Sequence, residues 1–266
     1  MKAYLSKFAV LIAVFFSFKS VKAQEIKVLT YNIYHGEKNY QPGNSNIQDI
    51  AAIINQYKPD FVAMQEVDSM TNRTAAFNNG QAKDLVKELA KLTGMHGYFG
   101  KAINYSNGGY GEGLLSKYPG KPVVYHLPTP KGGEGRALIA VEHVFKNGKK
   151  IVFAGTHLCH EFEENRTAQA EHISSVLTGL NLPVVVAGDF NIEQGSKPYQ
   201  AITAKMTDAA LAFGEPQNTF PFDNPKIRLD YIFLDKTSNW TVKDVKVIKA
   251  DASDHMPVLV TLVLKK

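Results

Sequence analysis

The sequence reads LPVVVAGDFN from Leu182 to Asn191, an apolar run that ends in a carboxylate and an amide. A short run with three consecutive valines is typical of a strand that is buried on both faces. Asp189 and Asn191 are two positions apart, so an extended chain places both side chains on one side while Phe190 points into the core. This stretch therefore predicts a buried strand with two polar groups that face a common ligand.

Three other apolar runs end in the same way. Asn32, Glu66 and His157 each follow a short run of strand-forming residues. Active sites are commonly built from loops at strand ends on a rigid sheet, so the four endings predict one shared rim. Taken singly, such a residue is also typical of a turn or a cap, and only the recurrence favours a site.

Helical and extended patterns alternate along the first half of the chain, with a hairpin in the middle. Asn147-Gly148 is the strongest short hairpin signal, and it predicts that residues 136–144 and 149–156 are antiparallel neighbours. The periodicities predict helices over 47–54, 85–90 and 168–177, and further strands over 25–33, 61–66, 114–115, 182–188, 228–234 and 255–264. We therefore expect an α/β fold, a four-layered sandwich of two mixed β-sheets packed face to face with helices outside.

The N-terminal residues are typical of a cleavable export signal. Lys2 and Lys7 supply positive charge, residues 8–18 are almost all apolar, and Ala23 offers a small residue for cleavage. The apolar run is shorter than the roughly 20 residues that span a bilayer, so an uncleaved anchor is the less favoured alternative. We expect residues 1–23 to be a signal peptide and 24–266 to form one domain without a transmembrane segment, secreted or periplasmic.

Charge and cysteine content limit the partners of the chain and the source of its stability. The formal net charge is +5, and it falls to +1 without the four lysines of the signal segment. This near balance gives no support for a polyanionic partner. The single cysteine, Cys159, excludes an internal disulfide, so an ordinary hydrophobic core must stabilise the fold. We expect a monomer.

The polar residues near the strand ends are rich in oxygen ligands. The set comprises Asn32, Glu66, Asp189, Asn191, Asp230 and Asp254. Oxygen ligands suit a hard cation, so magnesium or manganese is favoured. A zinc site from His157, Cys159 and His160 is the alternative, but its spacing does not match the usual zinc patterns. Asp230, in an otherwise apolar strand, is also a candidate to orient a histidine.

Seven motifs occur in an order and at a spacing that point to one family. They are Leu29-Thr30-Tyr31-Asn32-Ile33, Gln65-Glu66-Val67, Gly113-Leu114-Leu115-Ser116, Thr156-His157-Leu158, Gly188-Asp189-Phe190-Asn191, Arg228-Leu229-Asp230-Tyr231 and Ser253-Asp254-His255. Together they resemble the endonuclease/exonuclease/phosphatase superfamily, which is similar to deoxyribonuclease I in fold. Residues 31–36 further resemble a secreted bacterial subgroup and hydrolase-like domains linked to glycolipid-anchor processing.

The resemblance implies roles for individual residues. Glu66 resembles the principal metal-ligating carboxylate, with Asn32 and Asp254 helping to hold the ion or its water shell. Asp189 resembles the carboxylate that positions the attacking water. The remaining matches are the amide Asn191, which donates to a phosphoryl oxygen, the pair His255 and Asp230, and His157 near the leaving group. Whether Asp189 or the His255 and Asp230 pair removes the proton from water stays open.

Four further residues are less certain matches. Arg136, in Glu134-Gly135-Arg136, resembles a family position that binds phosphate, and a plain surface arginine is the alternative. Glu112 departs from the amide or small residue of many relatives, and we interpret it as a solvated turn residue between glycines. Arg73 and Arg166 are weaker candidates, and Arg166 is interpreted as the partner of nearby glutamates in a surface ion pair.

These patterns predict a secreted, divalent-metal-dependent phosphoester hydrolase in which water attacks a phosphodiester or phosphomonoester in line. A small-molecule or phospholipid substrate is favoured over nucleic acid, because nucleases present a basic stripe that follows several phosphates. A secreted DNA or RNA endonuclease is the first alternative. The second, a catalytically inactive binding module, is opposed by the complete polar set.

Overall fold

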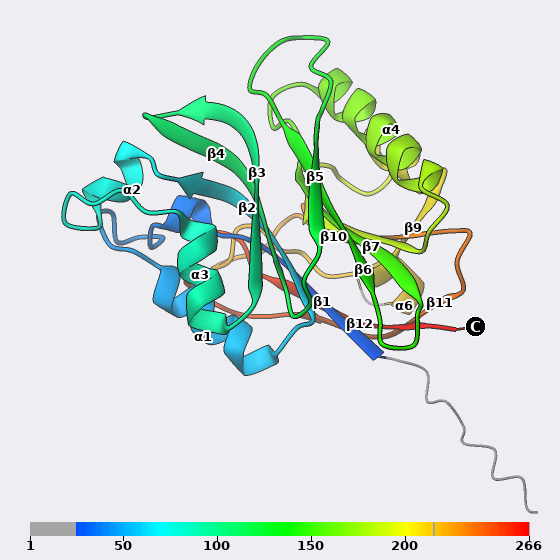
Figure 1. Cartoon of the computed structure of the whole chain (residues 1–266). Coiled ribbons are helices and arrows are strands. Elements are labelled where there is room, and N and C mark those ends of the chain that lie inside the picture. Colours follow the sequence, from blue (N-terminus) through cyan, green and yellow to red (C-terminus); the bar gives the residue numbers. More distant parts are fainter. Residues whose placement is uncertain (1–24, 215, 266) are drawn as a thin grey trace, which may run out of the picture.

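The apolar runs of the sequence form two mixed six-stranded sheets that pack face to face (Figure 1). The computed structural model describes residues 25–214 and 216–265, so the predicted signal peptide lies outside the described residues. The first sheet has the order β11-β12-β1-β2-β4-β3. Its strands are β1 (Glu25–Asn32), β2 (Phe61–Ser69), β3 (His96–Tyr105), β4 (Gly108–Ser116), β11 (Trp240–Val247) and β12 (Val258–Leu264).

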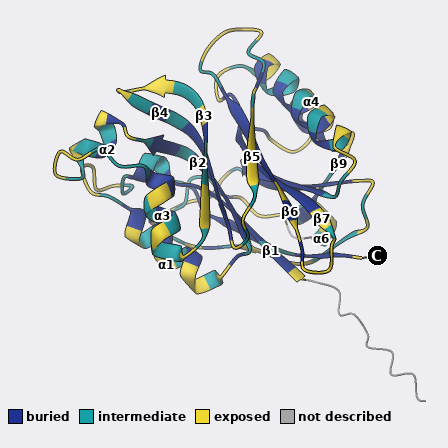
Figure 2. Cartoon of the chain, in the orientation of Figure 1, coloured by how far each residue is buried: buried dark blue, intermediate teal, exposed yellow. Residues whose placement is uncertain are grey.

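The second sheet has the order β5-β6-β7-β8-β10-β9. Its strands are β5 (Lys121–His126), β6 (Ala137–Val144), β7 (Lys150–His157), β8 (Val184–Asp189), β9 (Met206–Asp208) and β10 (Asp230–Asp235). In both sheets the inner strands are buried, whereas β5 at the edge is largely exposed (Figure 2). Apolar side chains from both sheets, including Phe61, Phe153, Val185 and Val260, form the central core.

Helices cover the outer faces of both sheets. On the first sheet, α1 (Ile47–Tyr57) and α3 (Leu85–Thr93) pack against β1 and β2. On the second sheet, α4 (Glu163–Gly179) and α5 (Lys197–Thr203) pack against β8 and β10. Three short elements are η1 (Tyr34–Gly36), α2 (Asn72–Ala76) and α6 (Ala209–Phe213). The structure therefore confirms the four-layered sandwich with helices outside.

Two parallel strand pairs bring the polar strand ends together. β1 runs parallel to β2, and β7 runs parallel to β8, whereas all other pairs within the sheets are antiparallel. The register places His157 beside Asp189, and the antiparallel partner β10 places Asp230 on the other side of Asp189. Because β1 and β2 also pack near β8 and β7, the ends of all four strands meet at one edge of the sandwich.

Local signals located the central elements correctly. The predicted hairpin is β6 and β7, and its Gly148 adopts a φ of +79° while Asn147 Oδ1 accepts a hydrogen bond from Lys149 N (3.0 Å). Helix α3 ends at Gly94, whose φ of +68° is the left-handed conformation typical of a glycine that ends a helix.

Other elements were not predicted. Strands β3, β5, β9 and β11 and helices α2, α5 and α6 carry weak periodicity because they lie at sheet edges or are short. The predicted strand 114–115 extends over Gly108–Ser116, since glycines at 111 and 113 allow close approach of its neighbours. Within the residues that the structure describes, no helix is both long and apolar enough to cross a membrane.

Candidate active site

Glu66 is directed into the site by a β-bulge. The register of β2 against β4 shifts between Met64 and Val67, and Glu66 adopts a φ of +57°. Residues other than glycine rarely occupy this left-handed region, and such conformations concentrate at functional sites. Bulges beside active sites re-aim a side chain, which is the effect here.

Asn32 links the carboxylates of the two sheets. Its Nδ2 donates to Glu66 Oε1 (3.0 Å) and to Asp189 Oδ2 (3.1 Å), while its Oδ1 accepts a hydrogen bond from the backbone N–H of Tyr34 (3.1 Å). The amide oxygen is therefore engaged by the backbone. Asn32 holds the carboxylates in place, so in this arrangement any help it gives to an ion acts through Glu66.

Asp189 and Asn191 both face the cavity, and Phe190 between them is fully buried, as expected. The chain is not extended here, because Asn191 has a φ of +50° and its backbone N–H donates to Asp189 Oδ1 (3.0 Å). Burial raises the pKa of Asp189, although the nearby His255 opposes this. Asp189 is thus a carboxyl group that titrates well above the usual range of aspartate.

His255 and Asp230 form a hydrogen-bonded pair. His255 Nδ1 lies 2.9 Å from Asp230 Oδ2, which also accepts a hydrogen bond from Thr219 Oγ1 (2.6 Å). The other ring nitrogen, Nε2, lies 3.7 Å from Asp189 Oδ2. Burial alone would lower the pKa of His255, but the carboxylates of Asp230 and Asp189 raise it. His255 is therefore an imidazolium between two carboxylates at neutral pH.

His157 is a buried, neutral imidazole. Burial, followed by the charge of Arg136, lowers its pKa well below the ordinary value. Asn191 Nδ2 lies 3.1 Å from His157 Nε2 and also donates to the carbonyl oxygen of Leu158 (3.1 Å). Arg136 Nη1 lies 3.4 Å from the other ring nitrogen, Nδ1, so each ring nitrogen of His157 faces a donor side chain. A neutral imidazole accepts at one nitrogen only, so it can accept from one of these two donors.

Arg136 is a buried member of the site. Its side chain is 3% exposed, which excludes the alternative of a plain surface arginine. Its Nη1 forms an ion pair with Glu134 Oε1 (2.6 Å), and its Nη2 lies 3.1 Å from His160 Nδ1. The guanidinium faces the same cavity as His157 and Asp189, and it supplies a fixed positive charge there.

One cavity of about 360 Å³ collects these groups. Its lining comprises Glu66, Tyr110, Glu134, Arg136, His157, His160, Asp189, Asn191, Phe220, Leu229, Asp254 and His255. Seven of the nine predicted site residues line it, and the other two, Asn32 and Asp230, lie behind and hydrogen bond to lining residues. The structure thus brings the whole predicted set together.

The donor set fits a hard divalent cation. Glu66 and Asp254 line the same cavity, and neither forms an ion pair with a lysine or arginine in the described part of the chain. Burial, together with the charge of Glu66, raises the pKa of Asp254, although the charge of His255 opposes this. Although burial opposes it, the contact with His35 and the hydrogen bond from Asn32 lower the pKa of Glu66 to about 2. Carboxylate oxygens are ligands that magnesium or manganese prefers.

A second acidic group lies beside this pair. Ligand atoms of Asp189, Asp230 and His255 lie within 4.8 Å of one another. His255 Nδ1 is already within hydrogen-bond distance of Asp230, so the imidazolium offsets part of the negative charge of the two carboxylates. The alternative zinc set is not assembled among the described residues, because Cys159 Sγ is buried and accepts from Phe162 N and Asn165 Nδ2 (3.5 Å each).

Our interpretations of Glu112 and Arg166 were wrong. Glu112 is 1% exposed within β4, where burial raises its pKa well above the ordinary value, so it is a buried strand residue and not a solvated turn residue. The strand was predicted too short to place Glu112 in it. Arg166 Nη1 donates to the carbonyl oxygens of Cys159 (3.0 Å) and His160 (3.1 Å), and it therefore braces the loop after β7.

Arg73 contributes from the rim. It makes two hydrogen bonds with the buried carboxylate of Asp68 (2.7 and 2.8 Å), and its guanidinium lies over the rings of Tyr105 (4.6 Å) and Tyr110 (5.5 Å). Through Tyr110 this stack reaches the cavity. Arg73 thus supports one wall of the site.

Sequence reasoning missed several lining residues. Tyr110, His160, Phe220 and Leu229 line the cavity, and His35 Nδ1 lies 3.6 Å from Glu66 Oε2. His35 and His160 each lie within three residues of a predicted site residue, so proximity in sequence was the available signal. Phe220 gave no such signal, because the segment before β10 has no clear periodicity.

Comparisons with known proteins agree with this geometry. The sequence model of the Endonuclease/Exonuclease/phosphatase family matches residues 29–255. The chain is 27% identical over 220 residues to the uncharacterized protein YbhP of Escherichia coli K12, covering 80% of this chain and 85% of YbhP.

Solved structures share the fold. An endonuclease/exonuclease/phosphatase family protein from Bacteroides thetaiotaomicron has a TM-score of 0.75 and 18% identity, covering 92% of this chain and 96% of that chain. A mannosyl-6-phosphatase from the same organism has a TM-score of 0.73 and 19% identity, covering 90% of this chain and 100% of that chain. On the match of the family model across most of its length, this chain belongs to the endonuclease/exonuclease/phosphatase family.

Proposed function

We propose that this chain is a divalent-metal-dependent phosphoester hydrolase, which catalyses in-line attack of water on a phosphodiester or phosphomonoester. One observation carries the proposal. The buried carboxylate of Asp189, 3.7 Å from the His255 imidazole, shares a cavity with two carboxylates, Glu66 and Asp254, that lack a lysine or arginine partner in the described chain. A base and an acidic cation site side by side are what this reaction needs.

Asp189 is the proposed general base. A carboxyl group whose pKa is raised toward neutrality combines sufficient basicity with the ionised state. The oxygen of the attacking water forms a bond to phosphorus while the bond from phosphorus to the leaving oxygen breaks. A proton of the water passes to Asp189, and the leaving alkoxide takes up a proton from solvent. His255, kept as an imidazolium by Asp230, stabilises the charge that develops on the phosphoryl oxygens.

The other polar groups bind and orient the phosphoryl group. Arg136 supplies a charge and Asn191 an amide beside the neutral imidazole of His157. Glu66 and Asp254 would hold magnesium or manganese, and a bound ion neutralises charge on the phosphoryl oxygens and polarises them. Positioning and electrostatic stabilisation supply most of the catalysis in phosphoryl transfer.

The proposed substrate is a small-molecule or lipid phosphoester, and the proposed state is a monomer. The near-balanced charge of residues 24–266 supports this choice over nucleic acid. The neighbour named mannosyl-6-phosphatase adds support, since its name describes a phosphomonoesterase that acts on a sugar. A secreted endonuclease is the outcome that would replace this proposal.

The decisive test is a substrate panel with purified protein and magnesium. The panel contains plasmid DNA, RNA, phospholipid vesicles, sugar phosphates and chromogenic phosphate mono- and diesters. We expect hydrolysis of small or lipid esters that a chelator abolishes and that magnesium or manganese restores. Full activity in chelator, or preferential cleavage of DNA, would reject the proposal.

We also propose export and removal of residues 1–23. The support is the charged, apolar and small-residue order of that segment. Mass spectrometry of the protein from the periplasm or medium of an expressing bacterium is expected to give an N-terminus at Gln24. A product that keeps Met1 inside the cell would contradict the proposal.

A further inference from the structure

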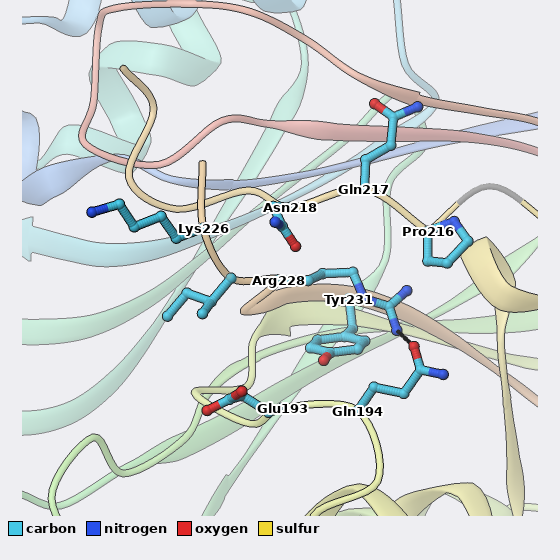
Figure 3. A pocket seen from close by; sticks show the side chains of 9 residues that line it. Glu193, Gln194, Pro216, Gln217, Asn218, Lys226, Arg228 and Tyr231 are labelled. Atoms are coloured by element: carbon cyan, nitrogen blue, oxygen red, sulfur yellow. Dashed lines mark hydrogen bonds between the residues drawn. The ribbon is translucent and has the colours of Figure 1, made fainter. Parts of the chain in front are cut away.

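A second cavity has a volume of about 240 Å³, and Figure 3 shows the residues that line it. It forms between the loop after β8 and the segment that leads into β10. Figure 3 shows Glu193 and Gln194 on one side of Arg228 and Tyr231, and Gln217 and Asn218 on the other. The volume is below the roughly 300 Å³ at which pockets for drug-sized ligands begin, so it fits one ring-sized group.

The two cavities share a wall. Asn191 lines the catalytic cavity, and Glu193, two residues later, lines the second one. Leu229 lines the catalytic cavity and the adjacent Arg228 lines the second one. Phe220 lines the catalytic cavity, and Asn218, two positions earlier, lines the second one. Residues two positions apart are at most about 7 Å apart along the chain. The segments that line the two cavities therefore lie within about 7 Å of each other, so an ester whose phosphoryl group is bound at Asn191 can reach the second cavity with its organic part.

The lining offers hydrogen-bonding groups that no other part of the fold uses. The side chains of Glu193, Gln217 and Lys226 form no hydrogen bond or ion pair with any residue that the structure describes. Gln194 uses only its Oε1, toward Arg228 Nη2 (3.4 Å), and Asn218 uses only its Nδ2, toward the carbonyl oxygen of Pro225 (3.4 Å). The lining therefore includes donors and acceptors that are unpaired among the described residues.

The charges in this cavity balance. Arg228 is neutralised by the buried carboxylate of Asp208 (Nη2 to Oδ2, 2.6 Å), and its guanidinium stacks on Tyr231 (4.3 Å). Lys226 and Glu193 contribute one charge of each sign. A second phosphate group would gain little electrostatic stabilisation from a lining without net charge. A neutral group with several hydroxyls, by contrast, can form hydrogen bonds with both the donors and the acceptors of the lining. Pro216 and Ile227 add apolar surface for the carbon face of such a group.

We propose that this cavity binds a polyhydroxylated ring, a sugar or a cyclitol, which is the organic part of the phosphoester cleaved next door. The proposal rests on the proposed hydrolase function and names its substrate class. Such a ring occurs in free sugar phosphates and in the headgroups of inositol lipids, and both sources present the same hydroxyl chemistry to the amides.

The test measures how two variants change substrate preference. The variants are Gln217→Ala and Asn218→Ala, with Asn224→Ala as the matched control. Asn224 is an exposed amide in the same segment that does not line the cavity. The readout is kcat/KM for mannose 6-phosphate divided by kcat/KM for p-nitrophenyl phosphate, and the same ratio for glycerophosphoinositol against bis(p-nitrophenyl) phosphate.

We expect at least one of the two ratios to fall about tenfold in each cavity variant, because a tenfold change corresponds to the loss of roughly one hydrogen bond. Both ratios should stay constant in the control variant. A fall confined to mannose 6-phosphate assigns a free sugar phosphate, and one confined to glycerophosphoinositol assigns a lipid headgroup. Unchanged ratios in both variants, with wild-type hydrolysis intact, would overturn the proposal and leave the hydrolase function standing.

A second readout covers the failure of the hydrolase proposal. If the wild-type protein cleaves none of the esters, binding of free mannose and free myo-inositol is followed by NMR chemical shifts. Binding that Gln217→Ala removes and Asn224→Ala keeps supports the ring site on its own. No binding of either ring to the wild-type protein would overturn it.

Discussion

Glu66 combines a backbone conformation that residues other than glycine avoid with a carboxylate whose pKa is lowered to about 2. The hydrogen bond from Asn32 and the nearby His35 keep this carboxylate ionised despite burial, which opposes ionisation. Among the described residues this carboxylate forms no ion pair with a lysine or arginine, so it is available to bind a cation. The bulge that strains the backbone is thus the feature that presents the charge.

Glu66→Gln removes this charge and keeps the shape of the side chain. We expect the magnesium concentration for half-maximal activity to rise by about tenfold or more, because a principal ligand is weakened. Titration of activity with magnesium and calorimetric titration with manganese check this. Glu171→Gln on the exposed face of α4 is the control, and equal titration curves for Glu66→Gln and wild type would contradict the assignment.

His255 and Asp230 are expected to act as a unit. His255→Ala should lower kcat/KM by about 100-fold or more, the lower range for acid, base or charge-stabilising groups. Asp230→Asn should cost less, because Asp230 acts on His255 through one hydrogen bond (2.9 Å). The double variant should resemble His255→Ala alone. The measurement is the steady-state kinetics of the three variants. If the fold-loss in kcat/KM of the double variant equals the product of the two single losses, the two residues act independently and the prediction is wrong.

At the scale of elements, Asp235 at the end of β10 ties the two sheets together. Its Oδ1 accepts from the backbone N–H of Val184 on β8 (2.7 Å) and from Trp240 Nε1 on β11 (2.8 Å). Its Oδ2 accepts from Ser238 N (2.8 Å) and Thr237 Oγ1 (2.7 Å). Although burial acts in the opposite direction, these hydrogen bonds lower the pKa of Asp235.

Asp235→Asn should therefore lower the free energy of unfolding by about 2 kcal/mol at pH 7, because buried donors lose a charged acceptor. A carboxyl group with a lowered folded pKa stabilises the fold above its unfolded value of about 3.9, and this stabilisation is lost as the pH falls through the folded pKa. The difference in the free energy of unfolding between wild type and Asp235→Asn should therefore become smaller below about pH 4. Urea unfolding at several pH values measures this difference, and Asp244→Asn on β11 is the control. A difference that stays constant with pH would exclude a contribution from the titration of Asp235.

At the scale of the whole molecule, the two sheets bring together groups from opposite ends of the chain. Asn32 on β1 contacts Asp189 on β8, and Ser253 Oγ donates to the carbonyl oxygen of Asn32 (2.7 Å). The site is therefore complete only when the sandwich has closed. The residues around it alternate in charge and form no single basic stripe among those lining the cavity.

This charge pattern predicts a shallow dependence on salt. A protein that neutralises several nucleic-acid phosphates loses affinity by roughly one logarithmic unit per phosphate for each tenfold rise in salt. A cavity that holds one phosphoryl group should lose far less. We expect kcat/KM on the best small ester to change by less than about threefold between 50 and 200 mM salt, with magnesium constant. Efficient DNA cleavage with a steep slope would instead identify a nuclease.

Much of the fold was predictable from sequence because its signals are local. The apolar runs of β1, β2, β7 and β8, the turn at Asn147-Gly148 and the glycine that ends α3 depend on residues close in the chain. The polar residue at each strand end was visible for the same reason. The nine residues predicted from the sequence all line this cavity or lie directly behind it, whereas other lining residues such as Tyr110 and Phe220 were not predicted.

Only the tertiary structure decided how those residues are presented. The bulge that turns Glu66 into the cavity depends on the pairing of β2 with β4, and the burial of Glu112 and Arg136 depends on the packing of one sheet on the other. The edge strands β3, β5 and β11 took their extended form from a partner strand more than from their own periodicity. Pairing and packing join residues that are distant along the chain, and such contacts leave no periodic trace in the sequence.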